Sequence, residues 1–278
     1  MSDDKKEFAA PEETAVETQH TIVIGGEEIS YTATAGTMVL KEENSKEGEP
    51  KAKAEIFYIA YRKNGVEDVA KRPLTFSFNG GPGSSSVWLH LGVLGPRRVL
   101  MDEIGNPLPP PAQLVDNEFS ILDQTDLVFI DPVNTGYSRA VPGEEAKQFL
   151  NYEKDIESVA EFIRLYLSRA QRWASTKILI GESYGTTRAS GLSGHLQDRH
   201  GIYMNGLMLI SAVLNFQTHN FDVGNDLPYP LILPTYTATA WYHGRLEKSL
   251  QKKSLPDLLA EVEKFALTDY SLALMQGS

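Results

Sequence analysis

Four short apolar runs in the middle of the chain constrain its fold more than any other feature. They are LTFSF (74–78), DLVFID (126–131), KILIG (177–181) and GLMLIS (206–211). Near-continuous apolar runs of this length are typical of strands buried on both faces of a parallel sheet. Between them, apolar residues recur every three or four positions over 149–170, which predicts one face of a helix. Strands that alternate with helices predict an α/β fold, with a mostly parallel sheet flanked by helices.

The segment before these runs follows a different pattern. Residues 21–62 indicate antiparallel strands, because two alternating runs flank Gly25-Gly26, a hairpin signal. We expect, in order, a third run (MVLK) after Gly36, a polar loop (42–53) and a further strand (54–63).

The chain divides into three parts. The composition of residues 1–19 predicts a disordered acidic lead-in. This segment lacks the apolar stretch of a secretory signal peptide. Residues 20–220 form the α/β core, and 221–278 begin an insertion. In that insertion, 221–243 is rich in proline and aromatic residues, which indicates an ordered irregular segment. Residues 245–275 are helical, and Pro256 lies at a helix start after Ser254.

Composition excludes several classes of function. The 278 residues include no cysteine, so disulfides, cysteine catalysis and thiolate metal sites are excluded. The net charge of −11 disfavours nucleic acid as a partner. The sequence contains no run of 18 apolar residues, so we expect no membrane-spanning helix. We expect no metal and no cofactor. The absence of cysteine and of a secretory signal favours a cytoplasmic location.

The pentapeptide GESYG (181–185) has the G-x-S-x-G pattern of a nucleophile elbow. The letters alone are a weak signal, and a serine in a glycine-rich turn is the alternative. Their context is stronger, because KILI precedes Gly181 and a helical segment follows Gly185, as this motif requires. A Cβ at either glycine is expected to collide with neighbouring chain. Ser183 is therefore the candidate nucleophile.

A second glycine-rich stretch, FSFNGGPGSSS (76–86), follows the end of a predicted strand. It lacks the Lys-Ser/Thr ending of a phosphate-binding loop. A tight turn and an oxyanion loop are the remaining interpretations. In hydrolases with this elbow, one oxyanion donor N–H follows the nucleophile and the other lies on an early strand-to-helix loop. Those donors are then Tyr184 and a glycine of Gly80-Gly81.

Three blocks together, FNGGPGSSSVWLHLGVLGP, DLVFIDPVNTGYS and GESYG, resemble the serine carboxypeptidase family of α/β-hydrolases. The resemblance covers about residues 20–245. It implies an α/β-hydrolase core and a serine-type carboxypeptidase, in which Ser183 is the nucleophile. It further implies oxyanion N–H groups from Gly81 and Tyr184. The partner is then a peptide with a free C-terminus, whose carboxylate is bound by Asn79, Gly80 and Glu182.

Glu182 can hydrogen-bond a substrate carboxylate only if one of the two carries a proton, so an acidic optimum is expected. An acid that favours a helix start is the alternative interpretation. Two positions depart from the family pattern. Val93 stands where many members have a second glutamate, which weakens the expected carboxylate clamp. Ser84 stands where a cysteine is usual.

The family's catalytic Asp and His lie later in the chain than residue 278. We therefore expect an incomplete N-terminal portion that is inactive alone and has its own missing C-terminal portion as a partner. The local histidines are poor substitutes: His195 lies on the helix of Ser183, roughly 18 Å away. Packing or surface is the default for His90 and His219. An esterase, an acyltransferase or a non-catalytic peptide-binding remnant remain alternatives.

Overall fold

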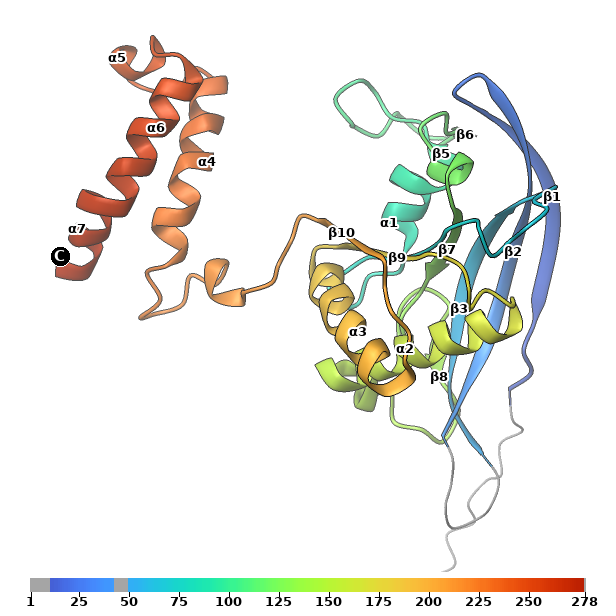
Figure 1. The fold of residues 1–278 in the computed structure, drawn as a ribbon. Helices are drawn as coiled ribbons and strands as arrows, with labels where there is room; N and C mark the ends of the chain where they lie inside the picture. Colours follow the sequence, from blue (N-terminus) through green and yellow to red (C-terminus); the bar gives the residue numbers. More distant parts are fainter. Residues whose placement is uncertain (1–10, 43–49, 278) are drawn as a thin grey trace, which may run out of the picture. The chain divides into compact units, whose positions relative to one another are not determined.

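The computed structural model describes residues 11–42 and 50–277 (Figure 1). Its contacts divide the chain after Val213, and the two units are described separately. The first unit contains the sheet and its helices, and the second unit, from Leu214, contains helices. We expected this boundary after residue 220, within the loop that follows the last strand.

The first unit is built on one eight-stranded sheet with the order β1-β2-β3-β7-β4-β9-β10, in which β8 pairs with β3. All four apolar runs form strands, and the sheet is parallel from β7 through β4 and β9 to β10. The predicted fold class, an α/β-hydrolase type with a mostly parallel sheet, is confirmed. The bounds are β1 Ala15–Ile24, β2 Glu27–Glu42, β3 Lys51–Lys63, β4 Leu74–Phe78, β7 Asp126–Ile130, β8 Arg139–Ala140, β9 Lys177–Glu182 and β10 Gly206–Ile210.

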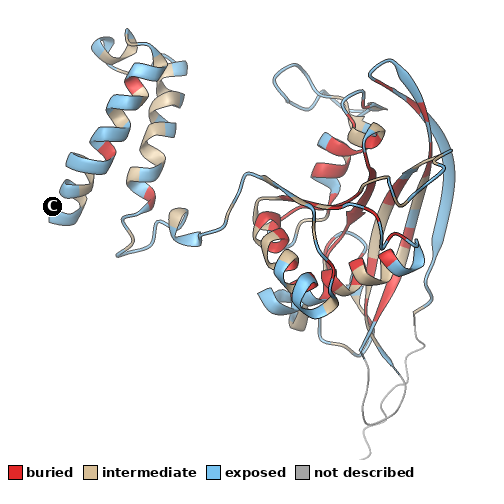
Figure 2. Cartoon of the chain, in the orientation of Figure 1, coloured by how far each residue is buried: buried red, intermediate tan, exposed pale blue. Residues whose placement is uncertain are grey.

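Successive residues of the buried strands face opposite sides of the sheet, and apolar cores lie on both sides, with β7 and β9 contributing to each (Figure 2). On one side Phe76 and Val128 pack with helices α2 (Tyr152–Arg169) and α3 (Tyr184–His200). On the other side Phe129 and Ile180 pack with α1 (Val87–Leu89) and the π-helical turn His90–Leu94. A two-stranded sheet, β5 Arg97–Val99 and β6 Leu114–Asp116, follows that turn.

Parallel pairing places the carboxyl ends of the central strands at one edge of the sheet. Phe78 of β4 pairs with Gly181 of β9, and Ile210 of β10 pairs with Glu182. The residues that follow these strands therefore meet there, which is where α/β proteins place their ligands.

The N-terminal segment differs from the prediction in two ways. Ala15–Gln19, expected to be disordered, forms the first half of β1 and pairs with β2; residues 1–10 lie outside the described residues. The strand β2 also runs unbroken through Gly36, because this residue pairs with Ala15 of β1 on one side and Tyr58 of β3 on the other. The hairpin at Gly25-Gly26 is confirmed, with φ of 60° and 87°.

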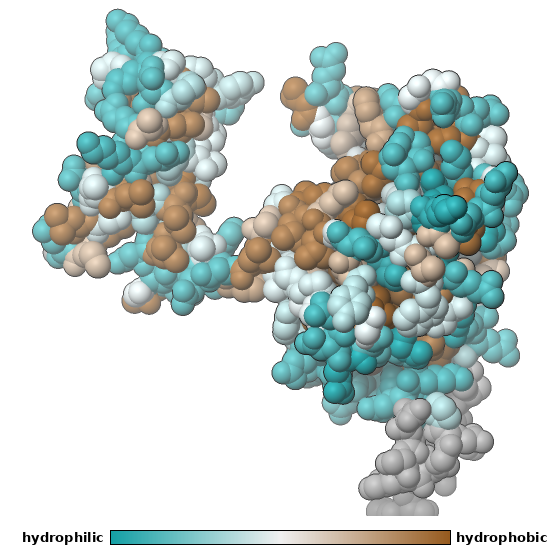
Figure 3. All heavy atoms as spheres, in the orientation of Figure 1, coloured by the Kyte–Doolittle hydropathy of each residue, from teal (hydrophilic) through white to brown (hydrophobic). Residues whose placement is uncertain are grey.

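The last strand, β10, is less buried than the sequence predicts. Leu207, Met208 and Ile210 are at least one-third exposed, and Figure 3 shows apolar surface in this region. The physical reason is its position: within the described residues β10 is hydrogen-bonded to one neighbouring strand, β9.

The second unit consists of α4 (Pro228–Tyr242), α5 (Lys248–Gln251), α6 (Leu255–Phe265) and α7 (Ser271–Gln276). The prediction of an irregular segment over 221–243 was wrong, because Pro228 starts α4 and Pro234 is accommodated inside it. Pro256 does lie in the first turn of α6, where Ser254 accepts a hydrogen bond from the backbone N–H of Asp257. None of the described helices combines the length and the apolar character needed to cross a bilayer.

Candidate active site

Ser183 occupies the sharp turn between β9 and α3. The strand ends at Glu182 and the helix begins at Tyr184, so the predicted strand–turn–helix context of GESYG is confirmed. The serine has φ 56° and ψ −126°, a strained conformation for a residue with a side chain. Its backbone N–H donates a hydrogen bond of 2.9 Å to the carbonyl oxygen of Ile210. This bond fixes the turn to the neighbouring strand, at the carboxyl edge of the sheet.

Two glycines allow the chain to make this turn. A Cβ built on Gly181 would lie 2.1 Å from the carbonyl oxygen of Gly185. One built on Gly185 would lie 2.9 Å from the carbonyl oxygen of Phe78. Because interiors are close-packed, a side chain at either position would force backbone apart. The predicted collisions are thus confirmed.

The glycine-rich loop after β4 packs directly on the backbone of this turn. A Cβ built on Gly80 would lie 2.4 Å from the backbone nitrogen of Tyr184 and 2.7 Å from the carbonyl oxygen of Glu182. Gly81 has φ 105°, a conformation that favours glycine. The segments that contain the two expected oxyanion donors, Gly81 and Tyr184, are therefore neighbours in space.

Asn79 and Glu182 are hydrogen-bonded to each other across the ends of β4 and β9. The Asn79 Nδ2 atom donates to Oε2 of Glu182 at 3.0 Å. The Asn79 Oδ1 atom accepts a 3.0 Å bond from the backbone N–H of Leu89. Both ends of the amide are thus engaged, which fixes its orientation. The structure brings together the two side chains to which the family resemblance assigns carboxylate binding.

A cavity of about 480 Å³ lies beside Ser183. It is lined by Asn79, Gly81, Ser84, Trp88, Leu89, Val93, Glu182, Ser183 and Ile210. Gly80 and Tyr184 are the two candidate site residues not among these lining residues. Four lining residues are apolar, namely Trp88, Leu89, Val93 and Ile210, and of these Trp88 and Val93 are at least half exposed. Val93, identified in the sequence as a departure from the family pattern, therefore contributes directly to the pocket.

The block DLVFIDPVNTGYS holds the end of the glycine-rich stretch, where it leads into α1. Asp131, just after β7, accepts hydrogen bonds from the backbone N–H of Ser86 at 2.8 Å and from its hydroxyl at 2.9 Å. Gly136 passes so close to this carboxylate that a Cβ there would lie 1.8 Å from Asp131 Oδ2. Asp131 therefore holds the start of α1, which contributes Trp88 and Leu89 to the cavity, and the missing side chain of Gly136 leaves room for that carboxylate.

A buried ion pair that contacts the glycine-rich loop was not predicted from the sequence. The Arg188 Nε atom donates to Oδ2 of Asp155 at 2.9 Å, and Nη1 donates to the Asn79 carbonyl oxygen at 2.7 Å. The guanidinium also lies 5.3 Å from the ring centre of Phe78 and 5.2 Å from that of Tyr184. Burial, assisted by the charge of Asp155, raises the pKa of Tyr184 to about 12, so its phenol stays neutral.

The sequence did contain a signal for this pair. Arg188 lies four residues after Tyr184 on one helix, so the two share a face. Asp155 precedes Ile156 on the apolar side of α2. A charged residue on each of two buried helix faces indicates a partner, although the partner's identity depends on how the helices pack.

His90 is a packing residue, as its default interpretation predicted. Its Nε2 atom is 2.6 Å from the hydroxyl of Tyr61, and its ring packs on Phe129. Burial lowers the pKa of His90 to about 4, so the ring is neutral at physiological pH. Its hydrogen-bonding nitrogen is engaged by Tyr61 and not by Ser183.

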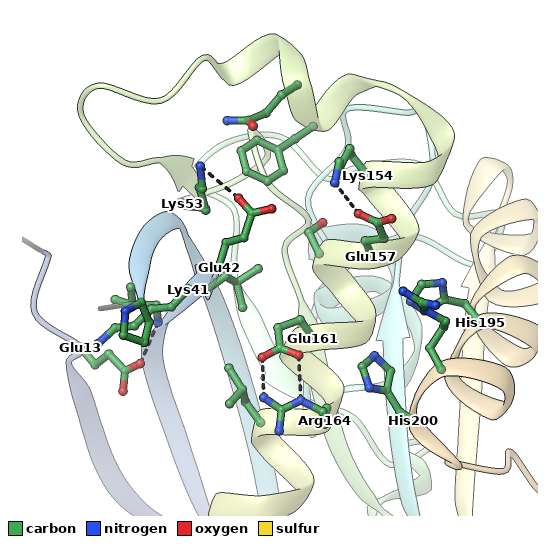
Figure 4. A pocket seen from close by; sticks show the side chains of 18 of the residues that line it. Glu13, Lys41, Glu42, Lys53, Lys154, Glu157, Glu161, Arg164, His195 and His200 are labelled. Atoms are coloured by element: carbon green, nitrogen blue, oxygen red, sulfur yellow. Dashed lines mark hydrogen bonds and ion pairs between the residues drawn. The ribbon is translucent and has the colours of Figure 1, made fainter. Parts of the chain in front are cut away.

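Two further histidines lie at the far end of α3. His195 and His200 line a hollow of about 910 Å³, where their ring centres are 5.7 Å apart (Figure 4). At 1.5 Å per helical residue, His195 is roughly 18 Å along the helix from Ser183. His20, in β1, stacks on Tyr31.

Opposite charges line the same hollow and largely pair with each other. Figure 4 shows the pairs Lys154–Glu157 and Arg164–Glu161, each at 2.6 Å, and the pair of Lys53 with Glu42, at 3.1 Å. The hollow therefore has no strong excess of either charge, and it lies away from the serine turn.

The remaining histidines belong to the second unit. His219 follows a short 3₁₀ turn and its Nδ1 atom is 2.6 Å from the hydroxyl of Thr218. His243 follows α4 and packs against Tyr242. Over residues 11–42 and 50–277, no group of three or more His, Asp or Glu side chains is arranged to hold a metal ion.

Comparison with known proteins identifies the family. The model of the serine carboxypeptidase family matches residues 46–257. The chain belongs to the serine carboxypeptidase family. The match spans all three sequence blocks that carried the resemblance, and it extends into the second unit.

One curated relative and one solved structure describe the similarity further. The chain is 32% identical over 157 residues to the pheromone-processing carboxypeptidase KEX1 of Saccharomyces cerevisiae, covering 54% of this chain and 20% of the relative. The crystal structure of the yeast KEX1 prohormone-processing carboxypeptidase aligns with a TM-score of 0.53 and 23% identity, covering 84% of this chain and 47% of that one. That structural likeness supports the fold alone. The chain thus spans about a fifth of its curated relative.

Proposed function

We propose that this member of the family is a serine-type carboxypeptidase with Ser183 as its nucleophile. The observation that carries the proposal is the strained turn of Ser183 beside a cavity that also contains the bonded pair Asn79–Glu182. The curated relative that is 32% identical over 157 residues, a pheromone-processing carboxypeptidase, supports the same class.

In the proposed reaction, the Ser183 oxygen attacks the carbonyl carbon of the last peptide bond and transfers its proton to a general base. The C–N bond then breaks, and the terminal amino acid leaves with a proton from the same base. Water hydrolyses the resulting ester on Ser183 and regenerates the hydroxyl. Negative charge on the carbonyl oxygen is stabilised by backbone N–H groups of Gly81 and Tyr184.

Asn79, Gly80 and Glu182 bind the free carboxylate of the peptide in this proposal. The fixed Asn79 amide and the close backbone approach at Gly80 support the assignment. Because carboxylate binding by Glu182 requires a shared proton, peptide turnover is expected to be favoured at acidic pH.

The base is proposed to come from outside residues 15–213. His20 and His90 are engaged with tyrosines of the strands, and His195 and His200 lie at the far end of α3. Without a base, binding and oxyanion stabilisation alone leave roughly 10³–10⁴-fold acceleration over water. We therefore also propose that a further segment of the protein supplies the base and the acid. A cytoplasmic location is a separate part of the proposal.

The test compares peptides that have free and amidated C-termini, with a simple ester as a third substrate, in the native protein. A carboxypeptidase should prefer the free acid strongly, and Ser183→Ala should lower kcat by about 10⁶. Equal rates on the free and amidated peptides would favour the esterase or acyltransferase alternative. Peptide binding without turnover would favour a binding protein.

A further inference from the structure

Arg188 is the largest fully buried side chain among the residues that the structure describes, with 1% of its surface exposed. It lies in α3, just after the serine turn, and its partner Asp155 lies at the start of α2, the helix beside it (Figure 1). Side-chain exposures of 1% and 10% mean that both charges have left water almost completely. Such a pair persists only where its geometry and its additional hydrogen bonds compensate for lost hydration.

The additional hydrogen bond goes to the backbone of the glycine-rich loop. Arg188 Nη1 donates to the Asn79 carbonyl oxygen at 2.7 Å, while Nε donates to Asp155 at 3.1 and 2.9 Å. The guanidinium also lies close to the rings of Phe78, which precedes the loop, and of Tyr184, which follows the serine. One side chain therefore connects α2, the glycine-rich loop and the serine turn.

This contact fixes the direction of a peptide group in the site. A peptide group is planar, so the orientation of the Asn79 carbonyl also sets that of the Gly80 N–H. Glycines rotate easily, and the loop that follows contains Gly80, Gly81 and Gly83. A flexible loop of this kind needs an anchor at its start if its N–H groups are to stay aligned.

We infer that Arg188, held by Asp155, is a positioning residue that aligns the glycine-rich loop with Ser183. It does not touch substrate in this assignment and acts through the Asn79–Gly80 peptide group. The inference rests on the proposed function, because it assigns that loop the oxyanion and carboxylate contacts.

The test replaces the guanidinium with an apolar chain of similar length, Arg188→Met, in the native protein. A misplacement of about 1 Å lowers the rate of a positioned reaction by about 10². We expect kcat on a free-acid peptide to fall about 100-fold, because the contacts that are lost act on alignment. The rate constant for modification of Ser183 by a fluorophosphonate should fall in parallel.

The chain offers a matched control for the loss of a buried ion pair. Arg172 is also buried and donates to Asp126 at 2.5 Å and to the Arg72 carbonyl oxygen at 2.7 Å. Asp126 begins β7, so this pair lies at the opposite ends of the strands from Ser183. Arg172→Met should lower the unfolding midpoint as Arg188→Met does. Below that midpoint, its kcat should stay within about twofold of wild type, because no loop of the site is attached to it.

Two results would overturn the inference: a folded Arg188→Met protein with kcat within twofold of wild type, or equal losses of kcat in both variants. If Arg188→Met does not fold, Arg188→Lys decides the question. Its single ammonium retains the charge but not the planar fork, so about a tenfold loss of kcat is expected, and unchanged kcat contradicts the account. Ser183→Ala is measured in parallel. Turnover by that variant would reject the proposed function, whereas an inactive Ser183→Ala with a fully active Arg188→Met rejects the positioning role alone.

Discussion

Replacing Gly80 by alanine tests the backbone contact on which the site depends. The added Cβ would lie 2.4 Å from the Tyr184 nitrogen, whereas ordinary contacts begin at 3.4 Å, so the loop and the turn must separate by about 1 Å. The atoms in the way are backbone atoms of Glu182, Tyr184 and Gly185, which cannot rotate aside. Overpacking of this kind costs about 1–3 kcal/mol of folding free energy. A displacement of about 1 Å should also lower kcat about 10²-fold.

The assay combines urea unfolding with the rate of Ser183 modification by a fluorophosphonate. Gly194→Ala is the control, because Gly194 lies inside α3 and a Cβ there meets nothing within 4 Å. That substitution should raise stability by up to about 1 kcal/mol through helix propensity and leave the modification rate unchanged. A Gly80→Ala protein with wild-type stability and modification rate would refute the close approach of the two segments.

Two further predictions concern pH. Glu182→Gln should flatten the fall of kcat/KM toward alkaline pH, because an amide donates a hydrogen bond to the substrate carboxylate at any pH; an unchanged profile would count against the assignment. Burial lowers the pKa of His90 from 6.5 to about 4. Between pH 6.5 and pH 4 the unfolded chain is therefore protonated at His90 while the folded chain is not, so folding stability is lost as the pH falls through this range. His90→Gln should remove about 3 kcal/mol of this loss between pH 7 and pH 4, measured by urea unfolding, and equal losses in both proteins would contradict it.

The strands of the sheet and the serine turn could be predicted from the sequence because their signals are local. Four apolar runs, each too short for a helix, indicated buried strands, and all four pair in parallel. The elbow was predictable because Gly181 and Gly185 meet a steric demand set within a few residues. The glycine-rich loop lies on the turn because β4 and β9 end at the same carboxyl edge of the parallel sheet.

Features that depend on distant partners were not predictable. Arg188 and Asp155 are 33 residues apart in sequence and lie on different helices, and neither residue alone reveals its partner. Residues 15–19 belong to a lead-in rich in Glu, Thr and Ala, whose composition indicated disorder, yet their backbone completes an antiparallel ladder with β2. In α4, Pro228 and Pro234 suggested an irregular segment, although a proline is tolerated in a first helical turn.

The central claim is that Ser183 is the residue acylated during turnover. The most direct measurement treats the native protein with a fluorophosphonate and maps the adduct by mass spectrometry of its peptides. The account predicts one adduct, on Ser183 in the GESYG peptide, with loss of peptidase activity in proportion to labelling. An adduct on a different residue that accompanies the loss of activity would contradict it, as would undiminished turnover by the Ser183→Ala protein.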